Sequence, residues 1–224
     1  MQALSLWNES WTRAGWTAQV INQEDAHRSP GYEHYLSSFY DLPTVNRIEY
    51  EVSCYMRWVA MSVVAGPGAV MTDYDVLNIA WPPQEVPERL HVLEGIVPAV
   101  VIGSAAEFER IATFFADFKV PATQAEREAE HFVKKDGGQV HLSDMILVQH
   151  AVKSLKIIDS NHTAFGYGEK GGENAPLVHF SHSAVHAHGE GKSRNALMRE
   201  ALDNAAKQDA APSQSGETPE GLVV

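Results

Sequence analysis

The sequence has a single cysteine and no long apolar run. With only Cys54 present, an internal disulfide framework is excluded. No stretch approaches the ~20 consecutive apolar residues that a membrane-spanning helix needs. The opening residues, MQALSLWNES, lack the basic n-region of a signal peptide. We therefore expect a cytoplasmic protein, either free in solution or peripheral at a membrane, with no transmembrane segment.

Basic residues are scarce as well. Lysine and arginine total 17 against 29 aspartates and glutamates, which gives a formal net charge of −12. A nucleic-acid groove needs a surplus of positive charge facing the phosphates, so we expect no nucleic acid among the partners. Hydrophobic content is 44%, which is ordinary for a globular domain, and 224 residues are enough to bury a full core.

Strand-like and helix-like segments alternate along the chain. Apolar residues at helical spacing predict helices at residues 3–13, 32–42, 44–65 and 104–118, and one that begins at 145. Short apolar runs predict strands at residues 16–21, 69–75, 90–93, 99–102 and 177–180. This alternation is typical of a single α/β domain with a mixed central sheet flanked by helices. We expect that domain to span residues 1–204, and the small, polar residues 205–224 to form a disordered tail.

Two carboxylates, Asp73 and Asp75, stand at the end of a predicted strand in the segment GPGAVMTDYDVLN. In open α/β sheets, ligands bind at the carboxyl ends of strands. Side chains two residues apart on an extended chain share one side. Two close carboxylates repel each other unless a cation lies beside them, and carboxylate oxygens suit Mg²⁺ and Mn²⁺. The pair predicts a divalent-metal site, and a solvated turn is the alternative.

The residues before this pair make the pattern more specific. In YMRWVAMSVVAGPGAVMTDYDV, a helix carries Arg57 and Trp58, two glycines follow, and a strand ends in Asp73-x-Asp75. This segment resembles the signature of the DxD glycosyltransferases of the GT-A fold. It is most similar to the group of the yeast-type initiating mannosyltransferases and bacterial capsular sugar transferases. ESWTRAGWTAQVI and VPAVVIGSAAEFE are similar to the same group, so the resemblance covers about half of the chain.

The resemblance implies a Rossmann-like GT-A domain and roles for particular residues. The family has a nucleotide-binding strand before its tryptophan helix, and we expect that strand to be missing here. Asp75 would bind the metal, assisted by Asp73, which faces the sugar or ribose. Arg57 would hold a donor phosphate or ribose, unless it forms a structural salt bridge. Asp144 would be the general base of an inverting enzyme or orient the acceptor in a retaining one. The alternative is structural: Ser143 or Asp144 would cap the helix that begins at Met145.

The segment LVHFSHSAVHAHGEGKSR holds four histidines, followed by Lys192 and Arg194. Many GT-A enzymes place a histidine after the last core strand as a third metal ligand, with a lysine beyond it on the donor diphosphate. His179 lies in the predicted strand, which would give a rigid mount. His186 instead matches the spacing H-x-x-G-x-x-K, which ends at Lys192. Both alignments stay open, and so does a solvated surface segment.

These expectations combine into a metal-dependent glycosyltransferase. It would use Mn²⁺ or Mg²⁺ and move a sugar from a nucleoside diphosphate sugar to a hydroxyl of a carbohydrate or glycolipid acceptor. One alternative is a metal-dependent hydrolase built on Asp73, Asp75 and the H-x-H of His186 and His188. A second alternative is a catalytically inactive module that binds nucleotide sugars.

Overall fold

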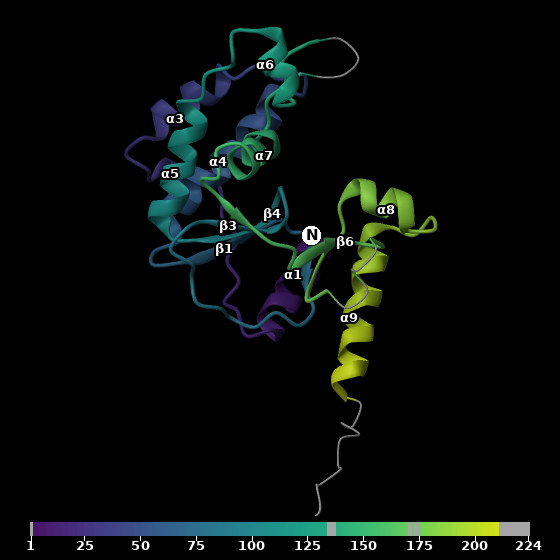
Figure 1. Ribbon diagram of the computed structural model, residues 1–224. Coiled ribbons are helices and arrows are strands. Elements are labelled where there is room, and N and C mark those ends of the chain that lie inside the picture. The colour runs from purple at the N-terminus through teal and green to yellow at the C-terminus, as the bar shows by residue number, and fades with distance from the viewer. Residues whose placement is uncertain (1, 134–137, 170–171, 173–174, 211–224) are drawn as a thin grey trace, which may run out of the picture.

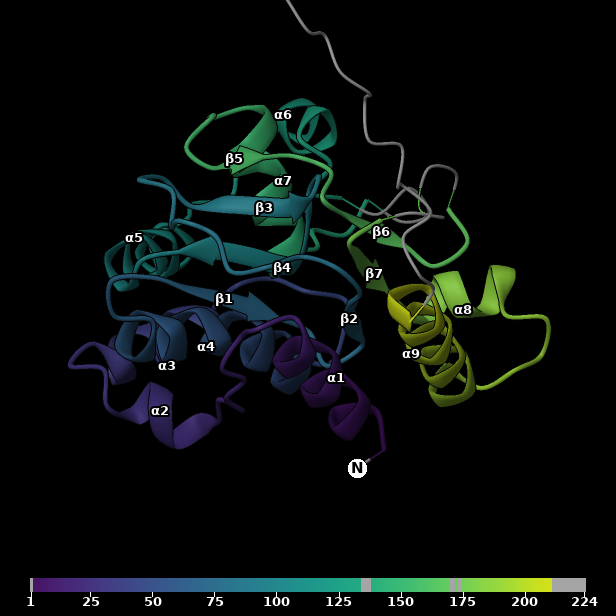
Figure 2. The ribbon, with the colours of Figure 1, turned by 90° about the horizontal axis from the view of Figure 1, so that it is seen from below.

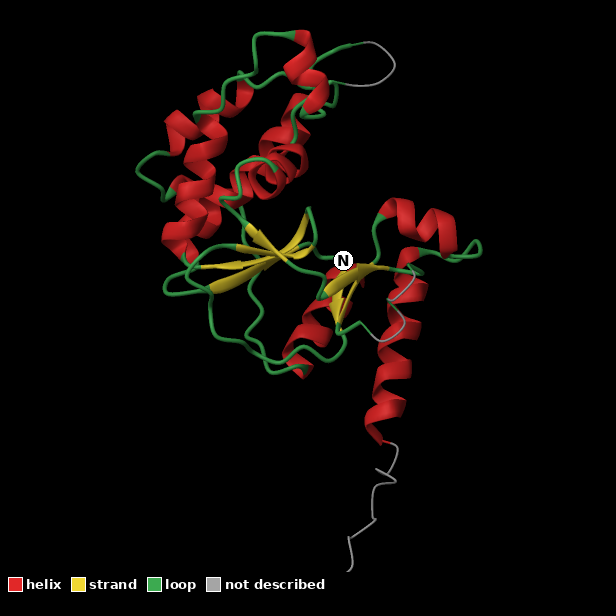
Figure 3. Ribbon diagram, in the orientation of Figure 1, coloured by secondary structure: helices red, strands yellow, loops and turns green. Residues whose placement is uncertain are grey.

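A four-stranded and a three-stranded sheet form the centre of the structure, and helices flank both (Figures 1 and 3). The computed structural model describes residues 2–133, 138–169, 172 and 175–210. The helices are α1 (Gln2–Arg13), α2 (Gln23–His27), α3 (Tyr32–Tyr40), α4 (Ile48–Val64), α5 (Ala105–Ala116), α6 (Gln124–Ala129), α7 (Asp144–Lys153), α8 (His182–His188) and α9 (Arg194–Ala210). The strands are β1 (Ala69–Thr72), β2 (Val76–Asn78), β3 (His91–Glu94), β4 (Val97–Gly103), β5 (Asp159–Ser160), β6 (Ala164–Gly166) and β7 (Leu177–His179).

The larger sheet has the strand order β1-β4-β3-β5 and is mixed. β1 and β3 both pair antiparallel with β4, and β5 joins β3 in parallel. A two-residue turn connects β3 to β4, and Gly95 adopts a φ of 62° there, which glycine does at little steric cost. Along β4, Val101 packs into one core cluster, whereas Val100 and Ile102 pack into another. The strand therefore has apolar contacts on both faces.

Helices cover both faces of this sheet. In Figure 1, α3, α4, α5 and α7 lie above it and α1 lies below it. The upper face holds the main core, which includes the fully buried rings of Trp58, Phe108 and Phe115. Rings of this kind bury about 150–250 Å² each, so this layer is a major source of stability. On the lower face, Trp7 and Trp11 of α1 pack against the sheet.

The smaller sheet has the order β2-β7-β6, with an antiparallel and a parallel pair. Figure 2 shows it beside the larger sheet, with α9 packed along it. Leu197, Met198 and Leu202 of α9 are buried with Leu77 of β2 and Phe180. The chain leaves the larger sheet at Thr72, turns through residues 73–75 and enters the smaller sheet at Val76. The acid pair therefore lies where the two sheets meet.

Most of the predicted elements are confirmed, and two differ clearly. Residues 16–21 form an irregular segment rather than a strand. Trp16 anchors it, because its ring stacks on Trp81 at a centroid distance of 5.0 Å and its Nε1 donates to the Trp81 carbonyl at 2.9 Å. The strand predicted at 69–75 ends at Thr72, so the two acids lie in a turn.

The predicted tail begins too early. Helix α9 continues through residue 210, and Leu202 and Ala205 are buried. The remainder of that predicted tail, residues 211–224, lies outside the described residues. The histidine-rich segment also contains a helix, α8, capped at its start by the Ser181 hydroxyl, which accepts from the Ala184 N–H. Within the described residues, none of the helices is long and apolar enough to cross a bilayer.

Candidate functional site

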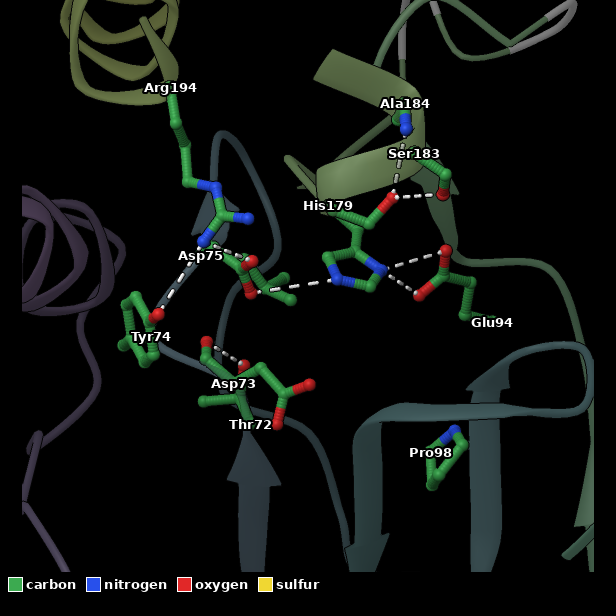
Figure 4. Close-up of polar contacts among 12 residues, drawn as sticks. Thr72, Asp73, Tyr74, Asp75, Glu94, Pro98, His179, Ser183, Ala184 and Arg194 are labelled. Atoms are coloured by element: carbon green, nitrogen blue, oxygen red, sulfur yellow. Dashed lines mark hydrogen bonds and ion pairs between the residues drawn. The ribbon is translucent and has the colours of Figure 1, made fainter. Parts of the chain in front are cut away.

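Three potential metal ligands meet at the carboxyl ends of strands (Figure 4). Asp73 directly follows β1, Asp75 lies in the turn to β2, and His179 ends β7. One ligand atom from each lies within 4.8 Å of the other two. The backbone holds them in place, because Asp73 N–H donates to the Ala99 carbonyl at 2.9 Å and Phe180 N–H donates to the Asp75 carbonyl at 2.8 Å. The structure thus brings together the two acids and one of the two candidate histidines.

Glu94, the last residue of β3, orients the histidine of this cluster. The Nδ1 atom of His179 lies 2.9 Å from a Glu94 carboxylate oxygen, and its Nε2 lies 3.5 Å from Asp75 Oδ1. Burial lowers the pKa of His179, but the hydrogen bonds and charges of Asp75 and Glu94 outweigh burial and raise that pKa to about 10. The imidazole is therefore a cation at neutral pH, and a metal ion that binds Nε2 must displace a proton. Glu94 would stay on Nδ1 and fix the tautomer, as carboxylates do behind metal-bound histidines.

Arg57 of α4 connects Asp73 to Asp144. One guanidinium nitrogen forms an ion pair with Asp73, and Nη2 lies 2.7 Å from Asp144 Oδ2 and 3.3 Å from the Pro98 carbonyl. Burial lowers the pKa of Arg57, but Asp144 and Asp73 raise it above its usual range, so the guanidinium stays charged. Burial raises the pKa of Asp73, and the neighbouring Arg57 opposes that rise. Arg57 is thus a permanent, firmly held cation beside the metal cluster.

Asp144 is the first residue of α7, one residue before the predicted start, and of the two predicted cap residues it is Ser143 that caps the helix. The Ser143 hydroxyl accepts from the Ile146 N–H at 3.3 Å. The Asp144 carboxylate is buried and accepts from Arg57 and from Trp58 Nε1, the latter at 3.3 Å. A general base must reach the proton of the acceptor hydroxyl. The Asp144 carboxylate instead accepts hydrogen bonds from two side chains of the protein, Arg57 and Trp58. In this structure its contacts hold Arg57 in position.

Arg194, the first residue of α9, reaches Asp75 from the side opposite His179 (Figure 4). Its Nη1 lies 3.1 Å from Asp75 Oδ2 and 3.5 Å from the Tyr74 hydroxyl oxygen. Asp75 is therefore flanked by two cationic groups, one on each carboxylate oxygen.

Two of the sequence candidates lie outside the cluster. His186 is exposed on α8, and the metal-ligand group found among the described residues does not include it. Lys192 is exposed and forms an ion pair with Glu200 at 2.8 Å. The spacing H-x-x-G-x-x-K is therefore not the pattern that builds the cluster.

Sequence reasoning missed Glu94 and did not select Arg194. Glu94 has the same signal that singled out Asp73, since it is a carboxylate at the end of a predicted strand, directly before a glycine. Arg194 stands two residues after Lys192, and no sequence spacing indicates which of these two basic side chains would reach the site. Only the direction in which α9 starts brings Arg194 to Asp75.

Two cavities adjoin this site. One of about 540 Å³ has Asp73, Thr72 and Arg57 on its polar side. The apolar residues in its lining are Ala3, Leu4, Trp7, Val20, Ile21 and Met71. A second cavity of about 370 Å³ shares Ile21 and Arg57 with the first and extends between α2, α3 and α4. Space for a ligand is thus present directly beside the acid pair.

Comparison with known protein families, with curated proteins and with solved structures finds no match to this chain. A mixed α/β fold hosts many unrelated activities. The function therefore has to be argued from the chemistry of the site.

Proposed function

We propose that this protein is a glycosyltransferase of GT-A type that depends on a divalent metal ion. It would transfer a sugar from a nucleoside diphosphate sugar to a hydroxyl group of a carbohydrate or glycolipid. The observation that carries the proposal is the cluster of Asp73, Asp75 and His179 at the carboxyl end of β1, with Arg57 beside it. The sequence resemblance around the DxD segment points to the same activity.

The donor set of the cluster fits a divalent ion such as Mn²⁺. Two carboxylates supply hard oxygen ligands, and Nε2 of His179 supplies a nitrogen ligand that Mn²⁺ accepts. Glu94 behind Nδ1 provides the partner that metal-bound histidines usually have. When held by Asp73, Asp75 and His179, the ion would offset the charge that develops on the leaving diphosphate.

The surroundings of the cluster fit the rest of the donor. Arg57 and Arg194 place two further positive charges beside the acids, where a diphosphate would need them. The adjoining cavity of about 540 Å³ has the size of a small-molecule site. Trp7 and Arg57, which line it, each have a buried side-chain N–H without a partner among the described residues, and unpaired buried donors are rare.

The two alternatives predict different behaviour. A hydrolase built on the acids and the H-x-H segment would need His186 and His188, but both side chains are exposed on α8 and do not enter the cluster. Such a hydrolase would respond to metal without nucleotide. An inactive binding module would take up nucleotide with metal but would leave the donor sugar uncleaved.

The test combines binding and turnover. UDP or GDP at 100 times its Kd should stabilise the protein by about 2.7 kcal/mol, which raises Tm by about 5–10 °C for a chain of this size. This rise should require Mn²⁺, and a screen of nucleotide sugars with Mn²⁺ should show donor hydrolysis. Asp75→Asn should abolish both, because it removes ligand charge at little cost in packing. The control Asp203→Asn, at an exposed position on α9, should behave as wild type. Absence of both signals in the wild-type protein refutes the proposal.

A further inference from the structure

Arg194 and a bound metal ion would compete for the same carboxylate. Asp75 Oδ1 faces His179 Nε2 at 3.5 Å, and Oδ2 faces Arg194 Nη1 at 3.1 Å. The Asp75 side chain is buried, so little water screens these charges. A divalent ion on Asp75 would lie close to the guanidinium, and like charges at such separation repel. Binding of the ion alone is therefore opposed by Arg194.

Arg194 is held much more loosely than Arg57. Its contacts with Asp75 and with the Tyr74 hydroxyl both use Nη1, and its side chain is 26% exposed. Arg57, in contrast, binds two carboxylates and the Pro98 carbonyl through both terminal nitrogens. A guanidinium held at one end can leave its partner by rotating its side chain. Arg194 is thus the cation of the site that is able to move.

The open space around Arg194 adjoins the proposed donor site. Arg194 lines an open cavity of about 500 Å³ next to Tyr74 and Ala3. The cavity beside Asp73 is lined by the same Tyr74 and Ala3, so the two are neighbours. A guanidinium released from Asp75 would therefore stay at the mouth of the donor cavity. Its planar fork binds phosphate oxygens in a bidentate way.

We propose that Arg194 exchanges places with the divalent ion on Asp75 as the donor binds, and that it moves from the carboxylate to the donor diphosphate. The inference rests on the proposed function and adds to it a mechanism for coupled binding. The ion alone must displace Arg194 from its partner, whereas the ion together with a diphosphate gives Arg194 a new partner. Metal and nucleotide should therefore bind synergistically.

Lys192 is the competing candidate for the same role. It is exposed and its ammonium group pairs with Glu200 of α9 at 2.8 Å. It also lines the open cavity next to Arg194, but it has no contact with Asp75 or Tyr74 in the described residues. The exchange therefore assigns the diphosphate to Arg194 rather than to Lys192.

The test uses Arg194→Gln in the full chain, with Mn²⁺ affinity measured by electron paramagnetic resonance and UDP or GDP affinity by calorimetry at saturating Mn²⁺. The variant should bind Mn²⁺ alone about tenfold more tightly, because a competing charge is gone. It should bind the nucleoside diphosphate about tenfold more weakly, because a charge-assisted contact is lost. The control Arg199→Gln removes the same charge from an exposed pair with Glu9 on the same helix. It should change both affinities less than twofold.

The opposite signs distinguish exchange from a structural role, which would weaken both affinities together. The inference is overturned if Arg194→Gln leaves Mn²⁺ affinity unchanged or lowers it, or if Lys192→Gln weakens nucleotide binding instead. These outcomes leave the proposed function intact when the wild-type protein binds UDP or GDP and hydrolyses a donor. If the wild-type protein with Mn²⁺ does neither, the proposed function fails and the inference falls with it.

Discussion

Replacing Asp144 with alanine should destabilise the protein more than replacing Asp73, although both carboxylates pair with Arg57. The Asp144 side chain is 7% exposed and accepts hydrogen bonds from Arg57 and from Trp58 Nε1. The Asp73 side chain is 34% exposed. Truncating Asp144 leaves the Trp58 indole N–H buried without its acceptor, and it leaves Arg57 Nη2 with the Pro98 carbonyl in place of a charged partner. Truncating Asp73 leaves Arg57 paired with Asp144, which is the more buried of its two carboxylate partners.

The two costs can be estimated from these contacts. Breaking a buried ion pair by removing one partner costs about 3–5 kcal/mol. A partly exposed ion pair contributes about 1 kcal/mol or less, because water screens it. Each kcal/mol lowers Tm by about 2–4 °C for a chain of this size. We therefore expect Asp144→Ala to lower Tm by about 6–20 °C, and Asp73→Ala by about 4 °C or less. Asp144→Asn should fall between them, because the amide oxygen still accepts a hydrogen bond without the charge.

Thermal and urea denaturation in the presence of EDTA measure this difference without any assumption about function. A double-mutant cycle with Arg57→Met isolates the pair. In that background Asp144→Ala should cost much less, because no cation loses its buried carboxylate partner. The reasoning is refuted if Asp144→Ala melts within 2 °C of the wild type, or if Asp73→Ala is the less stable variant.

The remaining predictions concern the histidines and α9. Calorimetry should show that His179→Ala weakens Mn²⁺ binding at least tenfold, and that the change His186→Ala at an exposed position weakens it less than twofold. Equal effects of the two changes would contradict the assignment of His179 as a metal ligand. The pKa of His179 is raised from 6.5 to about 10, so its charged form adds stability that is complete below pH 6.5 and is lost as the pH rises to 10. In EDTA, the Tm of the wild type relative to His179→Gln should therefore fall between pH 7 and 10, and a constant difference would count against the buried ion pairs. Leu202→Ala should cost about 2–5 kcal/mol by urea denaturation, because Leu202 is fully buried. The matched change at the exposed Leu155 should cost less than ~0.5 kcal/mol, and equal losses would mean that α9 is not docked.

Local signals in the sequence were enough to predict most elements. The start of α5 follows from Ser104, whose hydroxyl accepts from the Glu107 N–H at 3.3 Å. The start of α7 follows from Ser143 in the same way. Such caps act within one helical turn, so the residues involved lie only three positions apart in the sequence. The Ser104–Glu107 spacing is also that of a capping box, but the Glu107 carboxylate accepts from Leu90 N–H and from Arg110 instead of from the Ser104 N–H.

Elements that depend on distant contacts were harder to predict. The composition of residues 205–210 is that of a solvated segment, yet α9 continues through residue 210 and Ala205 is buried. The apolar run at 16–21 looks like a strand, but Trp16 finds its partner in Trp81, in a connection between elements. Tertiary packing overrides local preference at both places.

The sequence by itself determined the ligands that a metal site would draw on. Asp73 and Asp75 were identified by their position after a strand, and His179 by its place within one. The choice between His179 and His186, the contribution of Glu94, and the contact of Arg194 with Asp75 were decided by the tertiary structure. The physical reason is that β1, β3 and β7 belong to two different sheets. The packing of the cores beneath those sheets decides which of these carboxyl ends meet. Spacing along the chain does not predict that packing.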